Sequence, residues 1–541
     1  MAGITNAAVG QVSWARRFPR IILVLITLAC LLPFAGKAIH IDDPLFVWAA
    51  RHMQTQWWNP YGFDVNWYGS TMPMHEVTKN PPLASAYLAL IMSVFGENVI
   101  AFHLGFFAQA IAAVLGTYAL ARRLCSHPFQ ATLAALFTPV FMTSSTTLMC
   151  DMLMVALWVW AVALWIRGLD NNEPLTLVLA GLLIGVCALA KYFGIALVPL
   201  LLVYSLVHTR KVGTWLIYLA IPVVIMGIYE WASHALYGHG LLLDAFGYAK
   251  QNDAHTLHGF FIKTVTTVSF TGGCCAIALV VAPFLGRLIP RFRVGIAAAV
   301  SLATICFFNV TQLGMAFQYG LCVFGGLIVL TLAVLEWRRH KNAESLLLLL
   351  WVFGTIAFCV LNWTINGRSI LPMVPAVAIL LLRRIEAVSE AKALRLHWPL
   401  AVAAVLSLLV ARADYQLANS ARAAAIRIKN EFGGSAANTI WFEGHWGFQY
   451  YAEANGLIAF DSTDQRFRPG DLIVLPFNNT NLASIPREKV ERVSMIELPA
   501  SRWVATMSRP LGAGFYMDIL GPLPFAFGAV PDEKYYVLRF K

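Results

Sequence analysis

Apolar segments long enough to cross a membrane recur along most of the chain. The first covers residues 21–39, and comparable segments follow as far as Ala411. A helix of about 20 predominantly apolar residues spans the hydrocarbon core of a bilayer. The composition agrees, because 59% of the residues are hydrophobic and only 12% are charged, whereas a soluble domain carries about 25% charged residues. The sequence therefore predicts a polytopic membrane protein.

Basic residues in the short loops predict how the chain crosses the membrane, since Lys and Arg favour the cytoplasmic side. Successive clusters, such as Arg122-Arg123 and Arg210-Lys211, fall on one side if the apolar stretch 82–95 lies on the membrane surface and does not cross. This assignment gives about thirteen transmembrane helices, which include spans at about 129–147 and 263–285. The first segment is expected to be retained as a helix, because the residues after it make a mediocre cleavage site.

Two long polar regions then lie on the outer side of the membrane. One is the loop 40–82, which we expect to be catalytic and to include a surface helix, and the other is the tail 412–541. In the tail, "NTIWF" and "GDLIVLP" have the pattern of strands, and "WGFQYYAEANG" has that of a helix followed by the short strand "LIAF". The expected architecture is an all-α membrane bundle over residues 1–411, followed by a small extracytoplasmic α/β domain. The aromatic run "FEGHWGFQYYAE" in the tail either packs in its core or offers a surface to a sugar.

The net charge of the chain is +11. In a soluble protein such a charge would suggest a nucleic-acid partner. Here the basic residues cluster between apolar segments, so membrane topology explains the charge and no nucleic-acid partner is expected. We expect a multi-pass protein of a bacterial inner (plasma) membrane, in contact with membrane lipids, with its active site and C-terminus on the extracytoplasmic side.

Three aspartates are placed at the ends of predicted spans, where ionisable groups are costly and usually functional. Asp42 and Asp43 follow the first apolar segment, and Asp43-Pro44 is also a good helix start, for which one aspartate suffices. Asp151 begins a later span on the same side, where it could instead stabilise the helix dipole. We interpret the three as candidate catalytic carboxylates. Carboxylate oxygens are ligands of divalent cations, so Asp42 and Asp151, with or without Asp43, could hold such an ion. The sequence shows no metal-ligand spacing around them.

Three basic residues on the same predicted side are candidate phosphate ligands. Lys191 lies at an apolar helix hairpin, where a buried lysine requires an anion. Arg368 directly precedes a span, and its guanidinium matches phosphate oxygens. Lys79 is a third candidate. The alternative roles are anchoring at the membrane interface for Arg368 and in the lipid headgroups for Lys79.

The polar residues before Pro81-Pro82 complete the set. His75, Glu76 and Asn80 are candidate contacts to a donor or an acceptor. A carboxylate beside an acceptor hydroxyl can act as a general base. Cations beside a phosphate stabilise the charge that develops when it leaves. Acids and bases on one face of the bundle therefore favour a transfer reaction from a lipid-linked phosphate.

At these motifs the sequence resembles the membrane glycosyltransferases of the GT-C fold. It is most similar to the branch that contains the protein O-mannosyltransferases and the lipid A aminoarabinose transferase. The resemblance extends from Ile21 to about Ile385. It rests on the order and spacing of Asp42-Asp43 with "WAARHM", "NPPL", "ARRL", "CDM" at Asp151, "LAKYFG" and "RSILPMVP".

The resemblance implies a polyprenyl-phosphate sugar as the donor. It implies that Asp42 is the general base and that Asp151 is the second acid of the site. Lys191 and Arg368 would hold the donor phosphate, with Lys79 as a helper. No further cofactor is implied, and the acceptor is left open between protein, lipid and glycan.

A second function is a polytopic transporter or flippase of a lipid-linked or anionic substrate. Such proteins place charges near the middle of the bilayer on broken helices, often within internal repeats. Here the candidate charges lie at the ends of the predicted spans, and no repeat is visible in the sequence. The pattern therefore favours an enzyme.

Overall fold

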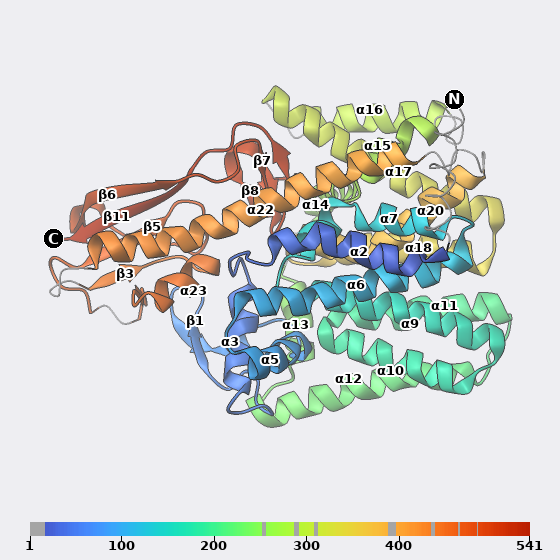
Figure 1. Ribbon diagram of the computed structural model, residues 1–541, viewed down its shortest axis with the longest axis horizontal. Helices are drawn as coiled ribbons and strands as arrows, with labels where there is room; N and C mark the ends of the chain where they lie inside the picture. The colour runs from blue at the N-terminus through green and yellow to red at the C-terminus, as the bar shows by residue number, and fades with distance from the viewer. Residues whose placement is uncertain are drawn as a thin grey trace, which may run out of the picture.

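The computed structural model describes residues 17–251, 256–285, 291–307, 312–387, 396–433, 439–463, 466–483 and 485–541. Long helices run side by side along the molecule, and a strand-rich part lies at one end (Figure 1). Within these residues, seven helical segments are long and apolar enough to cross a membrane. They are α6 (Val99–Leu124), α9 (Asp151–Asn171), η2 with α11 (Tyr192–Thr209), α12 (Trp215–Tyr237), α17 (Leu313–His340), α18 (Ala343–Leu361) and α22 (His397–Phe432).

Several shorter helices complete the bundle, and the count of about thirteen spans is not confirmed. The shorter apolar ones include α2 (Pro19–Leu31), α10 (Pro174–Ala190) and α16 (Arg291–Phe307). The predicted span 263–285 is divided into α14 (Leu257–Cys274) and α15 (Ile277–Leu285).

The predicted span 129–147 is also not one helix, but α7 (Pro128–Leu136) followed by α8 (Pro139–Ser144). Pro139 has no N–H group with which to continue the earlier helix. The Thr138 side chain instead caps α8 and accepts a hydrogen bond from the Phe141 N–H at 3.3 Å. The predicted span is therefore built from two helices that meet at this proline, and its crossing of the membrane stays a prediction.

The apolar stretch 82–95 forms the separate short helix α5 (Leu83–Phe95). Its 13 residues extend about 20 Å, less than the hydrocarbon thickness of about 30 Å. The helix ends at Gly96, whose φ of 63° favours glycine, and Asn98 then caps α6. The helix α5 packs against α3 (Asp43–Met53), and both lie at the end of the bundle that carries the strands (Figure 1).

The tail contains a five-stranded sheet with the order β4-β3-β5-β11-β6. The predicted elements are confirmed as β3 (Ile440–Phe442), α23 (Trp446–Ala454), β4 (Ile458–Ala459) and β5 (Leu472–Pro476). These three strands are parallel to one another. The sequence analysis did not include β6 (Val490–Leu498) or β11 (Glu533–Phe540), which join the sheet in antiparallel register.

The helix α22 connects the bundle to the sheet without a break (Figure 1). Its 36 residues extend about 54 Å, more than the thickness of a bilayer core. Near its end, Ala424, Ala425 and Ile428 pack into the core beneath the sheet. The predicted boundary between 411 and 412 falls within this helix, and the division into two domains stays a prediction.

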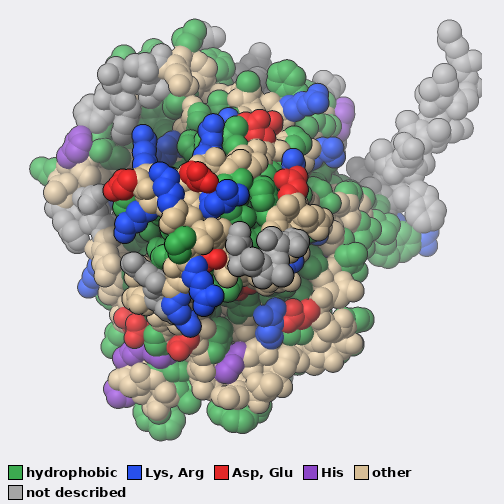
Figure 2. Space-filling model, turned by 90° about the vertical axis from the view of Figure 1, so that its left-hand side faces the viewer, with side chains coloured by type: hydrophobic (Ala, Val, Ile, Leu, Met, Phe, Trp, Pro, Cys, Tyr) green, Lys and Arg blue, Asp and Glu red, His purple; other side chains and the backbone are tan. Residues whose placement is uncertain are grey.

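The two ends of the bundle both carry charged side chains. Acidic and basic side chains are interspersed over the end that carries the sheet (Figure 2). On the sheet itself, Lys534 of β11 pairs with Glu497 of β6 at 3.1 Å. Far from the sheet, Arg383 Nε donates to Glu336 Oε1 at 2.6 Å. Charged ends separated by an apolar middle are typical of a membrane bundle.

Candidate active site

Four of the predicted residues meet where the bundle adjoins the tail. Arg368 Nη2 donates to Asp42 Oδ2 at 2.9 Å, and Arg368 Nη1 lies 3.6 Å from Asp151 Oδ2. Lys191 Nζ donates to Asp151 Oδ1 at 2.5 Å. We call Asp42, Asp151, Lys191 and Arg368 the ionic cluster, in which acids and bases alternate.

Each member of the ionic cluster is placed by the end of a helix. Asp42 immediately precedes α3, whose first turn contains Pro44. Asp151 is the first residue of α9, and Lys191 directly follows α10. Arg368 belongs to the short helix α19 (Gly367–Ile370). Helix ends leave side chains free to turn toward one another, so separate helices can build one site.

The two carboxylates of the ionic cluster differ in exposure. The Asp151 side chain is fully buried, whereas 31% of the Asp42 side chain is exposed. The Arg368 and Lys191 side chains are 12% and 18% exposed. The Asp42 carboxylate is therefore open to solvent, while the enclosed Asp151 carboxylate pairs with both cations.

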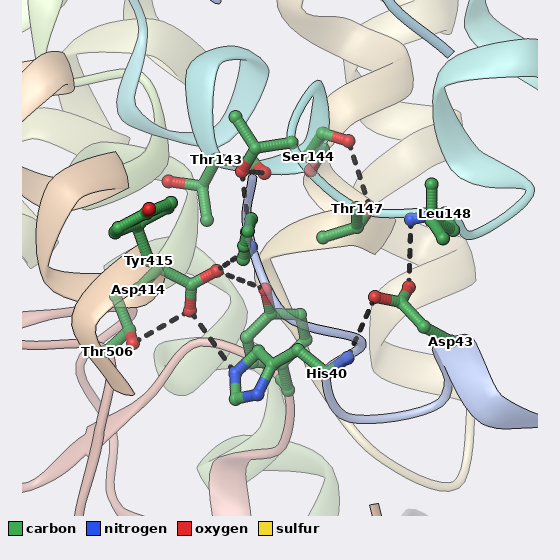
Figure 3. Close-up of polar contacts among 12 residues, drawn as sticks. His40, Asp43, Thr143, Ser144, Thr147, Leu148, Asp414, Tyr415 and Thr506 are labelled. Atoms are coloured by element: carbon green, nitrogen blue, oxygen red, sulfur yellow. Dashed lines mark hydrogen bonds and ion pairs between the residues drawn. The ribbon is translucent and has the colours of Figure 1, made fainter. Parts of the chain in front are cut away.

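Asp43 lies beside Asp42 but has different surroundings. It is fully buried, and its Oδ2 accepts a hydrogen bond from the His40 N–H at 3.0 Å. Its Oδ1 accepts one from the Leu148 N–H at 2.8 Å (Figure 3). Burial raises the pKa of Asp43 to about 7. The side chain ties the outer loop to the segment that precedes Asp151.

Lys79 contacts residues outside the ionic cluster. Its Nζ donates to Asp244 Oδ2 at 2.7 Å, and the ammonium lies 5.5 Å from the centre of the Tyr248 ring. Both partners belong to α13 (Leu241–Ala249). The lysine is thus already paired with a carboxylate of α13.

The other predicted contacts have separate positions. Asn80 Oδ1 accepts a hydrogen bond from Cys150 Sγ at 3.5 Å, which places it next to the residue that precedes Asp151. His75 stacks on Tyr237 with ring centres 4.8 Å apart. Glu76 is exposed. Of these three, Asn80 is the one that contacts Cys150, the residue next to Asp151 of the ionic cluster.

A second ionic group was not predicted from the sequence. Asp414 Oδ2 accepts hydrogen bonds from Lys37 Nζ at 2.5 Å and Tyr516 OH at 2.7 Å. Its Oδ1 accepts one from Thr506 Oγ1 at 2.9 Å, and His40 Nε2 lies 3.6 Å away (Figure 3). The Lys37 and Asp414 side chains are fully buried. We call these five residues the Asp414 network.

The Asp414 network contacts the ionic cluster through Tyr516. The Arg368 guanidinium carbon lies 5.5 Å from the centre of the Tyr516 ring. The adjacent Phe515 carbonyl accepts a hydrogen bond from the Gly367 N–H at 2.7 Å. The tail therefore contributes directly to the placement of Arg368.

A sequence signal existed for part of this network. Lys37 falls within the first apolar segment and Asp414 follows the last one, where ionisable residues are functional candidates by default. Tyr516 carried no such signal, because it lies in an ordinary aromatic stretch of the tail.

The arrangement bears on the possible metal site. The Arg368 guanidinium contacts both Asp42 and Asp151, the two carboxylates considered as ligands for a divalent cation. Over the residues that the structure describes, no group of three or more His, Cys, Asp and Glu side chains is placed to hold a metal. We therefore assign no chemical step to a metal ion.

A large apolar pocket, with a volume of about 530 Å³, lies beside the loop 40–82. The outer loop, α10 and α12 form its walls, and its lining includes Trp57, Tyr61 and Leu189. Leu189 is two residues from Lys191 in the chain. The Tyr61 hydroxyl donates to the Asn80 carbonyl at 2.9 Å. The lining thus includes the end of the helix that Lys191 directly follows, but none of the four cluster residues is part of it as described.

The comparison with protein families is consistent with the resemblance. Residues 79–234 match the family model of the dolichyl-phosphate-mannose-protein mannosyltransferases, which is the branch that the motifs resemble. This matched segment includes Asp151 and Lys191. A search of curated protein sequences gave no significant match.

Several solved structures are similar at low identity. The oligosaccharyltransferase of Archaeoglobus fulgidus has 13% identity and a TM-score of 0.49, over 83% of this chain and 64% of its own. ArnT of Cupriavidus metallidurans bound to undecaprenyl phosphate has 15% identity and a TM-score of 0.43, over 84% and 93%. The arabinofuranosyltransferase AftD from Mycobacteria has 14% identity and a TM-score of 0.41, over 96% and 40%. The chain thus spans less than two thirds of the archaeal enzyme and most of ArnT.

Proposed function

We propose that the protein is a GT-C-type glycosyltransferase that moves a sugar from a polyprenyl-phosphate donor to an acceptor on the outer face of the membrane. The observation that carries the proposal is the contact of the accessible carboxylate of Asp42 with Arg368, beside the Asp151–Lys191 pair. The family match over residues 79–234 supports the class of reaction.

In the proposed reaction, Asp42 removes the proton from an acceptor hydroxyl as that oxygen attacks the anomeric carbon. The bond between this carbon and the phosphate oxygen breaks, and polyprenyl phosphate leaves with its electron pair. Lys191 and Arg368 stabilise the charge that develops on the phosphate. Asp151 orients both cations, and Asp43 fixes the turn that carries Asp42.

The apolar pocket fits the lipid part of such a donor. Aromatic and aliphatic side chains line nearly all of it, and Leu189 of this lining belongs to the helix that Lys191 directly follows. A chain of isoprene units has no polar groups to satisfy, so burial in this pocket is favourable. The phosphate attached to that chain would then meet the cations.

The proposal predicts different roles for the two lysines. Lys191→Ala is expected to weaken binding of undecaprenyl phosphate by about tenfold or more, because a hydrogen bond between charged groups contributes about 1.5–3 kcal/mol. Lys79→Ala is expected to change it less than about threefold, because Lys79 pairs with Asp244 of α13 and not with a member of the ionic cluster. Native mass spectrometry of the purified variants measures both. Equal losses, or a greater loss for Lys79→Ala, would contradict the assignment, and thermal unfolding of each variant controls for folding.

Gene deletion tests the function in the cell. Mass spectrometry of envelope lipids and glycoproteins should show that one glycan loses a sugar, and that the intact gene restores it. An unchanged glycan profile combined with altered uptake of a solute would favour the transporter instead.

A further inference from the structure

A second cavity lies between the outer loop and the sheet of the tail, with a volume of about 290 Å³. Residues 66–69 of the loop form one wall, and the ends of β3 and β4 with residues 481–483 form the others. Asn66 Nδ2 donates to the Phe460 carbonyl at 2.8 Å, and the Ser462 N–H donates to the Gly69 carbonyl at 2.9 Å. These bonds hold the walls together. We call this space the loop cavity.

The loop cavity is separate from the ionic cluster, since its described lining contains none of the four cluster residues. Its size is near the lower limit of small-ligand sites, about 300 Å³. None of the described residues that line it is Lys or Arg. The lining therefore disfavours a phosphate or another anion.

Glu443 gives the loop cavity an unused hydrogen-bonding group. The residue is 4% exposed, and its Oε2 accepts a hydrogen bond from the Ala483 N–H at 2.9 Å. Among the described residues, Oε1 has no partner. An unpaired buried polar group costs about 1–3 kcal/mol. A ligand hydroxyl that reached Oε1 would remove this cost.

The remaining lining combines polar and aromatic groups. Trp67 and Tyr68 contribute rings, and Asn66 and Asn481 contribute amides. His445 also lines the cavity, and its Nδ1 has no partner within the described part of the chain. Aromatic rings pack against the C–H face of a sugar, while carboxylate, imidazole and amide groups bond its hydroxyls. This mixture suits a neutral polyhydroxylated ring better than a purely apolar ligand.

Tyr68 connects the loop cavity with the proposed catalytic base. Its side chain lines the cavity and is 43% exposed. The pKa of the Tyr68 phenol is raised by burial and, to a smaller extent, by the negative charge of Asp42. The adjacent lining residue Trp67 also packs edge-to-face against Trp48 of α3, the helix that Asp42 precedes, with ring centres 6.0 Å apart. The loop wall of the cavity therefore packs against the helix that follows the proposed base.

We propose that the loop cavity binds a saccharide, and that this saccharide is the sugar part of the acceptor. The first statement stands on the cavity alone. The second rests on the proposed function, because it assumes that Asp42 activates an acceptor hydroxyl. The acceptor is then a glycan or glycolipid, and an unglycosylated peptide is excluded.

Direct binding to the full-length protein in detergent tests the cavity, with no donor present. The probes are the methyl glycosides of mannose, glucose, galactose and arabinose, measured by saturation-transfer NMR and calorimetry. At least one is expected to bind saturably, and Glu443→Gln should weaken that binding about tenfold or more. If no probe binds saturably, or if Glu443→Gln binds as tightly as the unmodified protein, the saccharide site is wrong.

The chain offers a matched control for this test. Glu533 is another buried carboxylate of the same sheet, 9% exposed, and its Oε1 accepts a hydrogen bond from Asn478 Nδ2 at 3.0 Å. It does not line the loop cavity, so Glu533→Gln should keep saccharide affinity within about twofold. If Glu443→Gln fails to fold, Tyr68→Ala replaces it. This variant removes an exposed ring and should weaken binding several-fold, and unchanged binding would overturn the site.

Transfer assays separate the two parts of the proposal. If the protein binds a glycoside but transfers no sugar, the saccharide site in the loop cavity is supported and the glycosyltransferase function is rejected. If the protein transfers sugar to an unglycosylated peptide and a bound glycoside does not compete, the glycosyltransferase function is supported. The hypothesis that the acceptor is a saccharide is then rejected. Competition between the glycoside and the natural acceptor supports both.

Discussion

Asp42→Asn should lower the rate of sugar transfer by about 100-fold or more while the protein still accumulates in the membrane. A positioned general base contributes about 10²–10⁴-fold to a rate, and an amide cannot remove a proton from the acceptor. Asp42 is partly exposed and directly contacts Arg368, so the substitution changes the charge of the site without opening a core cavity. The rate is measured with purified protein and a polyprenyl-phosphate sugar.

Asp64 provides a control within the same outer loop. It is an exposed carboxylate at the start of the strand β1 (Asp64–Asn66). Asp64→Asn should leave the transfer rate within about twofold, because surface charges interact weakly with distant groups. Full activity of Asp42→Asn would contradict the assignment of the general base.

The largest effect on stability is expected for Asp414→Ala. The substitution leaves Lys37 buried without its carboxylate, and breaking a buried ion pair costs about 3–5 kcal/mol. It also removes the acceptor for Thr506 and Tyr516. Thermal unfolding in detergent, followed by tryptophan fluorescence, should show a midpoint several degrees lower. An unchanged midpoint would show that the network is not a main support of the fold.

Two further variants identify the cause of that loss. Glu431 pairs with Arg427 at 2.6 Å on the same helix, but both side chains are exposed. Glu431→Ala should therefore change stability by less than about 1 kcal/mol. The double variant Lys37→Met/Asp414→Leu should recover part of the stability lost in Asp414→Ala, because it removes both buried charges together.

Local sequence patterns predicted the elements that are governed by neighbouring residues. Asp43-Pro44 predicted the start of α3, and the turn residues and apolar alternation of the tail predicted β3, α23 and β5. The apolar length of 82–95 predicted a helix too short to cross, which α5 confirms. Pro139 was a local signal for a helix break, but the prediction for 129–147 was based on apolar length alone and did not use it.

Contacts between distant residues could not be derived in the same way. The partner of Lys79 proved to be Asp244, because the fold brings α13 over the outer loop. The pairing of Arg368 with Asp42 depends on how the bundle closes. Placement of Asp42, Asp151, Lys191 and Arg368 on one face followed from topology and from the family resemblance, and their roles stay predictions.

The dependence of Arg368 on the tail has a consequence for the synthesis of the protein. Phe515 binds Gly367, and Asp518 accepts a hydrogen bond from Thr364 at 2.7 Å. A nascent chain can insert every helix of the bundle before these late residues leave the ribosome. Until they are exported, the guanidinium lacks its support. We expect unfinished or prematurely terminated chains to be inert, so that lipid carrier is not consumed before quality control is complete.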